Sequence, residues 1–338
     1  MTSSNKSQRV TISDVAKRAG VSIATVSRVL NQTGPVSADT VATVQAVVDQ
    51  LGYQPNRAAR VLATQKTRVI GILVDEITGD YSLPLIRGIE LQTRRAGYQF
   101  MMSSTRRRLV GTHYLVNETN TDGLIVFANS VTESELERLT KLDFPVVLLA
   151  CTSPPRLSIP YVTVENESGA FEMASYLIKT RNYRNFAFLR GPDEHEDTLW
   201  RERGYREALT RHGLNYDEQV VGEGGFNEEK AYETVTQWIR RGLSMEVIVA
   251  FDDDSAIGAM AALRDANIQV PDEIAIVGFD DIRLSRYLTP PLTTVRIPIE
   301  EAAQIAVDKL IQLIEIGKSQ ESILLPTELI IRRSCGCC

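Results

Sequence analysis

The sequence predicts an α/β protein with an N-terminal all-α helix-turn-helix headpiece and two lobes that are each a doubly wound parallel sheet. Three observations support this fold class. Capped helical patterns occupy residues 11–52, apolar runs alternate with helical patterns from residue 67 onward, and the net charge changes sign between the two regions. The chain has 338 residues, which is too long for one typical domain, so two or three domains are expected.

The N-terminal region contains three helix-start signals. Thr11 and Asp14 have the spacing of a capping box, and Gly20 can adopt the left-handed conformation that ends the helix that follows. Ser22 can cap a second helix after a tight turn, and the pattern of residues 37–52 predicts a third. Two short helices joined in this way form a helix-turn-helix, whose second helix can enter a DNA major groove.

The alternative is an ordinary helical hairpin in a protein core, but the charge distribution favours a DNA-binding module. Residues 1–66 contain eight Lys and Arg against three acidic residues, a net charge of +5. The whole chain carries −6, which leaves −11 for residues 67–338. A basic head on an acidic body is typical of a nucleic-acid-reading module attached to domains with another role.

The outward face of the second helix predicts how bases would be read. We expect Arg28 to contact a guanine or a phosphate, and Ile23 and Ala24 to act through shape and contact with thymine methyl groups. The candidate DNA-contacting residues of the headpiece are Thr11, Ser22, Ile23, Ala24, Thr25, Ser27, Arg28 and Asn31.

Continuous apolar runs, the strand candidates, alternate with helical patterns in the rest of the chain. They lie at 69–74, 100–103, 123–127, 145–149, 185–189, 246–251 and 273–279. Apolar strands alternating with helices indicate parallel sheets covered on both faces, and there are too many strands here for one compact sheet. Such sheets bind ligands at the carboxyl ends of their strands.

The run TISDVAKRAGVSIATVSRVLN closely resembles the N-terminal signature of the LacI/GalR family of bacterial transcription regulators. The resemblance continues through PNRAARVLAT and VGFDDIRLSRYLTPPLTTVR to the end of the chain. It implies two lobes of periplasmic-binding-protein type, joined by crossing strands. The expected division is a headpiece at 1–54, a hinge at 55–66 and an effector-binding and dimerisation domain at 67–338. Within that last domain, lobe 1 is expected at about 68–163 plus 295–330, and lobe 2 at about 164–292.

The segment 56–64 would be only a marginal helix alone, so an interdomain linker is one interpretation. The resemblance implies instead a hinge helix that orders on operator DNA, with Leu62 wedged into the minor groove. Asn56 and Ala59 are the other hinge residues expected to contact DNA. Ala63 follows the leucine where relatives often have a basic residue.

Polar and aromatic side chains at strand ends are the candidates for a ligand site. They are Asp75, Tyr81, Arg201, Phe226, Asp252 and Asp280. An arginine with carboxylates at converging strand ends suits a polyhydroxylated ligand. The resemblance implies that all of these except Asp75 line an effector cleft, although Ile297 and the TGDYS loop depart from the family pattern. The expected effector is a sugar or sugar derivative, and a nucleobase-like effector is the alternative.

No catalytic or cofactor motif is recognised, so neither an enzyme nor a cofactor is predicted. The chain lacks G-x-x-x-x-G-K-[ST], G-x-G-x-x-G after a strand, and G-x-S-x-G. The three histidines match no metal spacing, and Asp252–Asp254 are interpreted as a helix cap in preference to a metal site. The Arg106–Arg108 run is interpreted as a solvated loop, and Cys335, Cys337 and Cys338 as a frayed tail.

The expected partners are a pseudo-palindromic operator, a small effector and a second copy of the chain. The second copy and the palindrome are expected because one helix-turn-helix reads too few bases to be selective.

No apolar run approaches the ~20 residues that span a bilayer, and no secretory signal is recognised. A cytoplasmic protein with reduced thiols is therefore expected, with no membrane association. The competing class is a solute-binding protein without DNA function.

Overall fold

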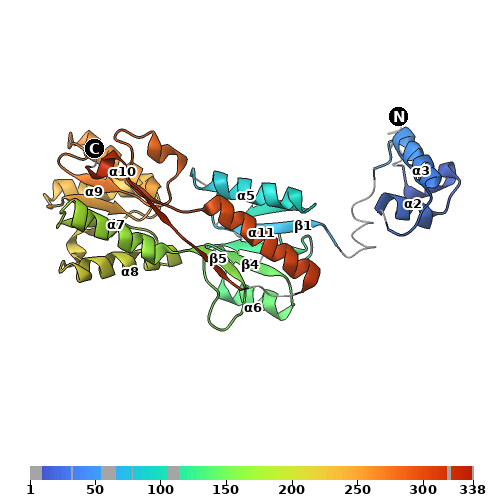
Figure 1. The fold of residues 1–338 in the computed structure, drawn as a ribbon, viewed down its shortest axis with the longest axis horizontal. Coiled ribbons are helices and arrows are strands. Elements are labelled where there is room, and N and C mark those ends of the chain that lie inside the picture. The colour runs from blue at the N-terminus through green and yellow to red at the C-terminus, as the bar shows by residue number, and fades with distance from the viewer. Residues whose placement is uncertain are drawn as a thin grey trace, which may run out of the picture. The chain divides into compact units, whose positions relative to one another are not determined.

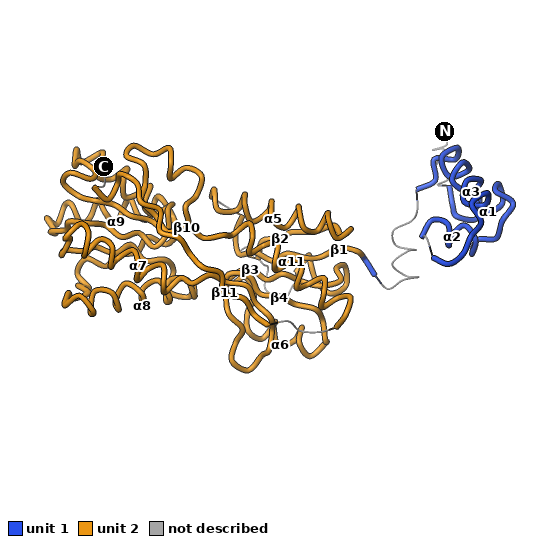
Figure 2. The backbone as a smooth tube through the Cα atoms, in the orientation of Figure 1, with its two compact units in different colours: residues 1–67 blue, residues 68–338 orange. Residues whose placement is uncertain are grey.

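The computed structural model describes residues 10–31, 33–54, 66–77, 79–105, 114–317 and 321–336. The chain forms two compact units, residues 1–67 and residues 68–338 (Figure 2). Each unit has its own hydrophobic core. No helix among the described residues is long and apolar enough to cross a membrane.

The first unit is a bundle of three helices, α1 (Ile12–Ala19), α2 (Ile23–Asn31) and α3 (Ala38–Leu51). The predicted capping box is confirmed, because Thr11 accepts a hydrogen bond from the Asp14 backbone and the Asp14 carboxylate accepts one in return. Gly20 has a φ of 68° and ends α1, and the Ser22 hydroxyl accepts from the Thr25 backbone N–H at 3.1 Å. The predicted helix-turn-helix is therefore confirmed, with its turn formed by local hydrogen bonds.

Lobe 1 of the second unit is built on a six-stranded parallel sheet in the order β11-β5-β4-β3-β1-β2. The strands are β1 (Val69–Val74), β2 (Gln99–Ser104), β3 (Gly123–Phe127), β4 (Val146–Leu149), β5 (Tyr161–Val164) and β11 (Ile323–Leu325). Its helices are α5 (Ser82–Arg95), α6 (Glu133–Lys141) and α11 (Ile299–Ile316). On β1, Ile70 and Ile72 belong to the core that also contains α5 and α11 residues, whereas Leu73 belongs to the core of α6.

Lobe 2 is built on a four-stranded parallel sheet in the order β7-β6-β8-β9. The strands are β6 (Phe186–Arg190), β7 (Val221–Glu223), β8 (Val247–Ala250) and β9 (Ala275–Val277). The helices are α7 (Asn166–Thr180), α8 (Glu196–Arg211), α9 (Glu228–Arg240) and α10 (Asp253–Asp265). Phe188 packs with the α7 and α8 core, and its neighbour Leu189 packs with the α9 and α10 core. Because both faces of each sheet are covered, the prediction of doubly wound parallel lobes is confirmed.

Crossing segments connect the lobes. β10 (Thr294–Arg296) pairs antiparallel with β12 (Glu328–Ile330), and the C-terminal strands run between the two sheets (Figure 1). The last described segment packs against lobe 2, where the Ser334 hydroxyl donates to the Ile276 carbonyl at 2.6 Å. The predicted frayed tail is wrong for Cys335, which is fully buried, because this segment packs against β9. Cys337 and Cys338 lie outside the described residues, as does the Arg106–Arg108 run.

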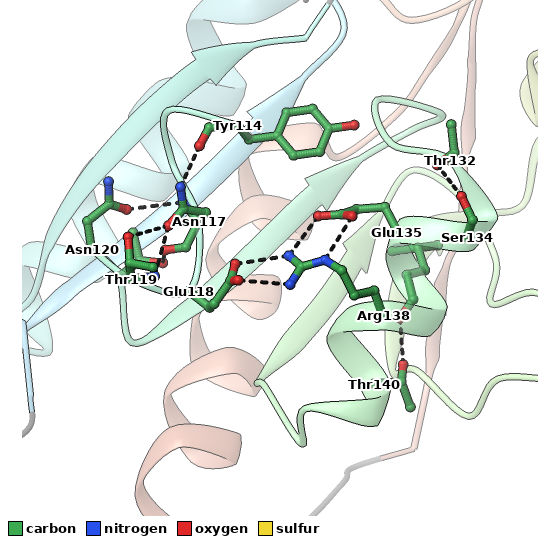
Figure 3. Close-up of polar contacts among 12 residues, drawn as sticks. Tyr114, Asn117, Glu118, Thr119, Asn120, Thr132, Ser134, Glu135, Arg138 and Thr140 are labelled. Atoms are coloured by element: carbon green, nitrogen blue, oxygen red, sulfur yellow. Dashed lines mark hydrogen bonds and ion pairs between the residues drawn. The ribbon is translucent and has the colours of Figure 1, made fainter. Parts of the chain in front are cut away.

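A polar cluster joins the loop before β3 to α6 (Figure 3). The Arg138 guanidinium donates two hydrogen bonds to Glu118, at 2.8 and 3.0 Å, and two to Glu135, at 3.0 and 2.9 Å. The Asn117 side chain accepts from the Thr119 backbone N–H at 2.8 Å and shapes the same loop. Bidentate arginine–carboxylate pairs are geometrically specific, so this cluster holds the loop before β3 against α6. The other end of β3 contributes to the site described next.

Candidate functional site

A cavity of about 160 Å³ lies between the lobes, at the carboxyl ends of strands from both sheets. Tyr81, Phe127 and Ala128 line it from lobe 1, and Arg201 and Phe226 are among the residues that line it from lobe 2. An apolar cavity of ~150 Å³ is large enough to bind benzene, so this space suits a small ligand.

Arg201 is the polar centre of this cavity. It lies on α8, is 2% exposed, and donates from Nε to Asn166 Oδ1 at 2.8 Å and from Nη1 to the Phe251 carbonyl. Its third donor, Nη2, lies 3.0 Å from Asp280 Oδ1. The guanidinium also lies 3.9 Å from the centre of the Phe279 ring. Every edge of the guanidinium is therefore held in place before any ligand arrives, which is how a binding group is preorganised.

Asp280 has an environment that disfavours its charge. Burial raises its pKa well above the ordinary value, while the neighbouring Arg201 acts in the opposite direction. Its backbone N–H donates to the Val295 carbonyl at 2.7 Å, so the end of β9 is connected to the crossing segment. A ligand that contacts Asp280 is consequently linked to the part of the chain that joins the lobes.

Three cavity-lining residues other than glycine have a left-handed backbone. Their φ values are 46° at Ala128, 55° at Phe226 and 109° at Asp280. Such conformations are uncommon for residues with a Cβ atom, and they concentrate at functional sites where the surrounding structure imposes them. The clustering supports a binding role for this cavity, and the sequence contains no local signal for it at Ala128.

The Asp252–Asp254 run has two roles. Asp252 caps α10, because its carboxylate accepts from the Ser255 backbone N–H at 3.3 Å, as predicted. Asp253 is fully buried and accepts from the Ile282 backbone N–H and from the hydroxyls of Ser285 and Thr294, at 3.0, 2.5 and 2.6 Å. It therefore positions the segment that follows Asp280, whereas its two neighbours line the cavity.

The structure brings together most, but not all, of the residues predicted from sequence. Five of the six line the cavity, namely Tyr81, Arg201, Phe226, Asp252 and Asp280. Asp75 is not among the lining residues; its carbonyl accepts from the Ser104 hydroxyl at 2.5 Å, and Glu76 lines the cavity in its place. The lining residues that sequence reasoning missed include Asp197, His195 and Asp254. Of these, Asp197 could have been found, because it lies one helical turn before Arg201 and pairs with it at 3.7 Å.

The lobes also contact each other beside the cavity. The backbone N–H and the hydroxyl of Thr152 donate to the two carboxylate oxygens of Glu196, at 2.6 and 2.5 Å. The Asn129 side chain donates to the Glu194 carbonyl. Thr152 and Asn129 belong to lobe 1, and Glu194 and Glu196 lie at the start of α8. These contacts depend on the two lobes being close together.

Replacing Asp254 with asparagine is expected to stabilise the protein increasingly as the pH rises. Burial, followed by the charges of Asp252, Glu228 and Asp80, raises the pKa of Asp254 from 3.8 to about 7. Because the folded state holds this proton more tightly, the native protein loses stability as the pH rises through that interval, and the neutral variant does not. Thermal unfolding near pH 5 and near pH 8 should show the larger gain at the higher pH. Asp272→Asn, at an exposed position, is the control; an equal gain at both pH values would contradict the prediction.

The proposed DNA-reading surface is the exposed side of α2. Ile23 is 50% exposed, which is unusual for an isoleucine in so small a bundle, and Ala24 and Arg28 are also exposed. Several of the other predicted contact residues use their side chains inside the headpiece. The Thr11 hydroxyl donates to Asp14 at 2.7 Å, Ser22 pairs with Thr25 at 2.9 Å, and the Asn31 amide donates to Ser27 at 3.2 Å. Asn56, Ala59 and Leu62 lie outside the described residues.

A helix-turn-helix headpiece joined to a two-lobed body with a ligand-sized cavity defines a DNA-binding protein controlled by a small molecule. Residues 11–56 match the model described as "Bacterial regulatory proteins, lacI family", and residues 174–335 match that of a periplasmic binding protein-like domain. Catabolite control protein A of Priestia megaterium is 32% identical over 96% of this chain and 99% of its own length. The chain belongs to the LacI family of bacterial transcription regulators.

Two solved structures of similar proteins share the whole fold. The lac repressor dimer bound to operator and the anti-inducer ONPF has a TM-score of 0.85 at 26% identity, over 97% of this chain and 99% of its own. A complex of the transcriptional regulator CelR with cellobiose has a TM-score of 0.70 at 26% identity, over 96% of this chain and 100% of its own. The similarity therefore covers both the headpiece and the two lobes.

Proposed function

We propose that this protein is a repressor that binds a pseudo-palindromic operator as a homodimer and that a small molecule, a sugar or sugar derivative, controls its operator affinity. The observation that carries the proposal is the buried Arg201–Asp280 pair, which opens onto a cavity lined by both lobes. We assign operator reading to residues 1–54, a DNA-ordered hinge to 55–66, and effector binding and dimerisation to 67–338. Because a bacterial operator lies on DNA inside the cell, the protein would act in the bacterial cytoplasm.

The chemistry of the cavity supports a polyhydroxylated effector. Carboxylates accept hydrogen bonds from hydroxyls, Arg201 donates them, and the Tyr81 and Phe226 rings can cover the apolar face of a sugar. The cellobiose complex of CelR supports the same ligand class. A nucleobase-like effector would use the rings as stacking surfaces and is a separate outcome of the test below.

Lobe closure is the proposed link between the effector and DNA. A ligand that touches both lobes favours the closed arrangement by its higher affinity for it, and the Thr152–Glu196 contact would add to that state. The hinges would follow lobe 1, so closure in a dimer would change the spacing of the two headpieces. Coupling of this type amounts to about 1–3 kcal/mol and is reciprocal, so the operator must change effector affinity by the same factor.

Fluorescence anisotropy with operator-like DNA tests the proposal. The full chain is titrated onto a labelled pseudo-palindrome and onto random DNA of equal length, with and without sugars and nucleobases. We expect two chains per operator and a ligand-dependent change in operator affinity of about 5- to 150-fold. Binding to the two DNAs with equal affinity would contradict operator recognition. A response to nucleobases alone would show that the effector is nucleobase-like and not a sugar.

Leu62→Ala should weaken operator binding much more than binding to random DNA. If the hinge orders on DNA, each Leu62 supplies an apolar wedge at the centre of the site, where a base step is opened and the duplex bends. Non-specific binding depends mainly on phosphate electrostatics and requires no opened base step. The two affinities are measured in parallel, with Ala63→Ser as the control. Equal losses on both DNAs would show that the hinge is only a tether.

A further inference from the structure

Asn166 lies where the chain first crosses from lobe 1 to lobe 2. It is the first residue of α7, and only Glu165 separates it from Val164, the last residue of β5. Asn166 is 3% exposed. The described residues that line the cavity include Arg201 and Asp197 but not Asn166. Asn166 therefore lies behind the cavity, at a junction between the lobes, and any effect that it has on a ligand must pass through other residues.

The Asn166 amide connects two oppositely charged residues of α8. Its Oδ1 accepts a hydrogen bond from Arg201 Nε at 2.8 Å, and its Nδ2 donates one to Asp197 Oδ1 at 2.8 Å. Arg201 Nη2 lies 3.7 Å from Asp197 Oδ2, so the direct ion pair is looser than either hydrogen bond to the amide. An amide supplies an acceptor to a cation and a donor to an anion from one group. A carboxylate would lack the donor, and an aliphatic side chain would lack both.

The first turn of α7 packs against the other two segments that cross between the lobes. A Cβ atom added to Gly169 would lie 2.6 Å from Thr327 Oγ1, just before β12, and 2.9 Å from Val295 Cγ1, in β10. The same atom would lie 3.2 Å from Phe279, and the Arg201 guanidinium lies 3.9 Å from the centre of that ring. Interiors packed this closely transmit displacements. The start of α7, the crossing segments and Arg201 therefore form one packed unit.

We propose that Asn166 is a positioning residue of the effector site, which holds Arg201 ready for the ligand and passes a displacement of Arg201 to the crossing segments. This inference rests on the proposed function, because it takes the cavity to be the effector site. Hydrogen bonds to charged groups are short and strong, and a buried polar group left without its partner is costly. A ligand that shifts the guanidinium must therefore move Asn166 with it or break that bond. Because Asn166 begins α7, its movement reaches the junction of the lobes.

The Nε–H signal of Arg201 tests this positioning without any ligand. Two-dimensional 1H–15N spectra are recorded on the full chain labelled with 15N in arginine, and Arg201→Lys identifies the Arg201 signal by its loss. Asn166→Leu has a similar shape and forms neither hydrogen bond, so it should move that signal or broaden it through faster exchange with water. Most other arginine signals should remain in place, which separates this effect from loss of the fold.

Asn166→Asp adds a pH profile to the same test. Burial raises the pKa of Asp197, and near pH 8 the new carboxylate would oppose the Asp197 charge while still accepting from Arg201. A proton shared between the two carboxylates restores a donor and an acceptor where the amide had them. The Arg201 signal should therefore approach its wild-type position near pH 5 and leave it as the pH rises to about 8.

The pH profile needs two controls, because other titratable groups surround this pair. These groups are His195, Glu196, Asp280, Tyr81 and Tyr205. The wild-type protein at each pH accounts for them, and Asn215→Asp places the same new charge at an exposed position of lobe 2. Neither control should show the recovery at low pH. If Asn166→Leu does not fold, as judged by circular dichroism, Asn166→Asp provides the test.

Sugar binding tests the same role in function. Glucose, galactose, mannose, fructose, ribose and cellobiose are titrated by calorimetry and in the anisotropy assay. For a sugar to which the wild-type protein responds, Asn166→Leu should weaken sugar binding about tenfold and abolish the operator response. Operator affinity without sugar should stay within about twofold of wild type. In an Arg201→Lys background, Asn166→Leu should cause less than about twofold further loss of sugar affinity, because it acts through Arg201.

Three results would overturn the inference. They are an Arg201 signal that Asn166→Leu leaves unchanged, a displacement in Asn166→Asp that is the same at every pH, and a full operator response to sugar in Asn166→Leu. Failure of the proposed function looks different. In that case none of the sugars changes the operator affinity of the wild-type protein, while the Arg201 signal still responds to the Asn166 variants as expected.

Discussion

Arg201→Ala should abolish the effect of any effector on operator binding and lower the free energy of unfolding by about 3–5 kcal/mol. The stability loss follows from the geometry, because removal of the guanidinium leaves Asp280 buried without its partner at 3.0 Å. The response is lost because the same side chain is the preorganised donor in the cavity. The free protein should still bind its operator, since the headpiece forms a separate compact unit with its own core.

A second variant separates the structural role of Arg201 from its binding role. Arg201→Met combined with Asp280→Asn removes both charges and retains an apolar side chain against the Phe279 ring. Replacing both members of a buried pair is often close to neutral, so most of the stability should return. The effector response should not return. Denaturant unfolding and operator anisotropy with ligand measure the two effects, and a full ligand response in the double variant would move the binding site elsewhere.

Arg28→Ala should weaken binding to the specific operator by about 1–3 kcal/mol. Arg28 is exposed on α2, close to the exposed Ile23 and Ala24, and it is the only arginine or lysine that α2 carries. If it binds a guanine edge, changing that base pair should weaken the wild-type protein but have little further effect on the variant. If it binds a phosphate, affinity should fall similarly on all sequences, with a smaller salt dependence.

The control for this experiment is Arg240→Ala, which removes one exposed charge at the end of α9 in the other unit. It changes the net charge of the chain by the same amount as Arg28→Ala. Its operator affinity should therefore remain within about twofold of wild type at fixed salt. Unchanged operator affinity in the Arg28→Ala protein would contradict the assignment of α2 as the reading helix.

Features that depend on neighbouring residues could be predicted from the sequence alone. The capping residues Thr11, Ser22 and Ser37 satisfy N–H groups within three positions of themselves, so their roles are visible without a fold. The buried strands at 69–74 and 123–127 could be predicted because they are apolar at nearly every position. Strand-end position and the family resemblance both make Arg201 and Asp280 candidates, but their separation of 79 residues hides their contact.

Only the tertiary structure determined which side chains meet in the cavity. Whether Glu76 or Asp75 lines the cavity depends on the direction in which the chain leaves β1. The left-handed backbone of Ala128 is imposed by its surroundings. The short strands β7, β10, β11 and β12 are too short for any hydrophobic period to show, so they exist only through pairing with distant partners. The burial of Cys335 and the approach of Asp254 to Gly79 likewise require segments far apart in the sequence to pack together, which no local pattern specifies.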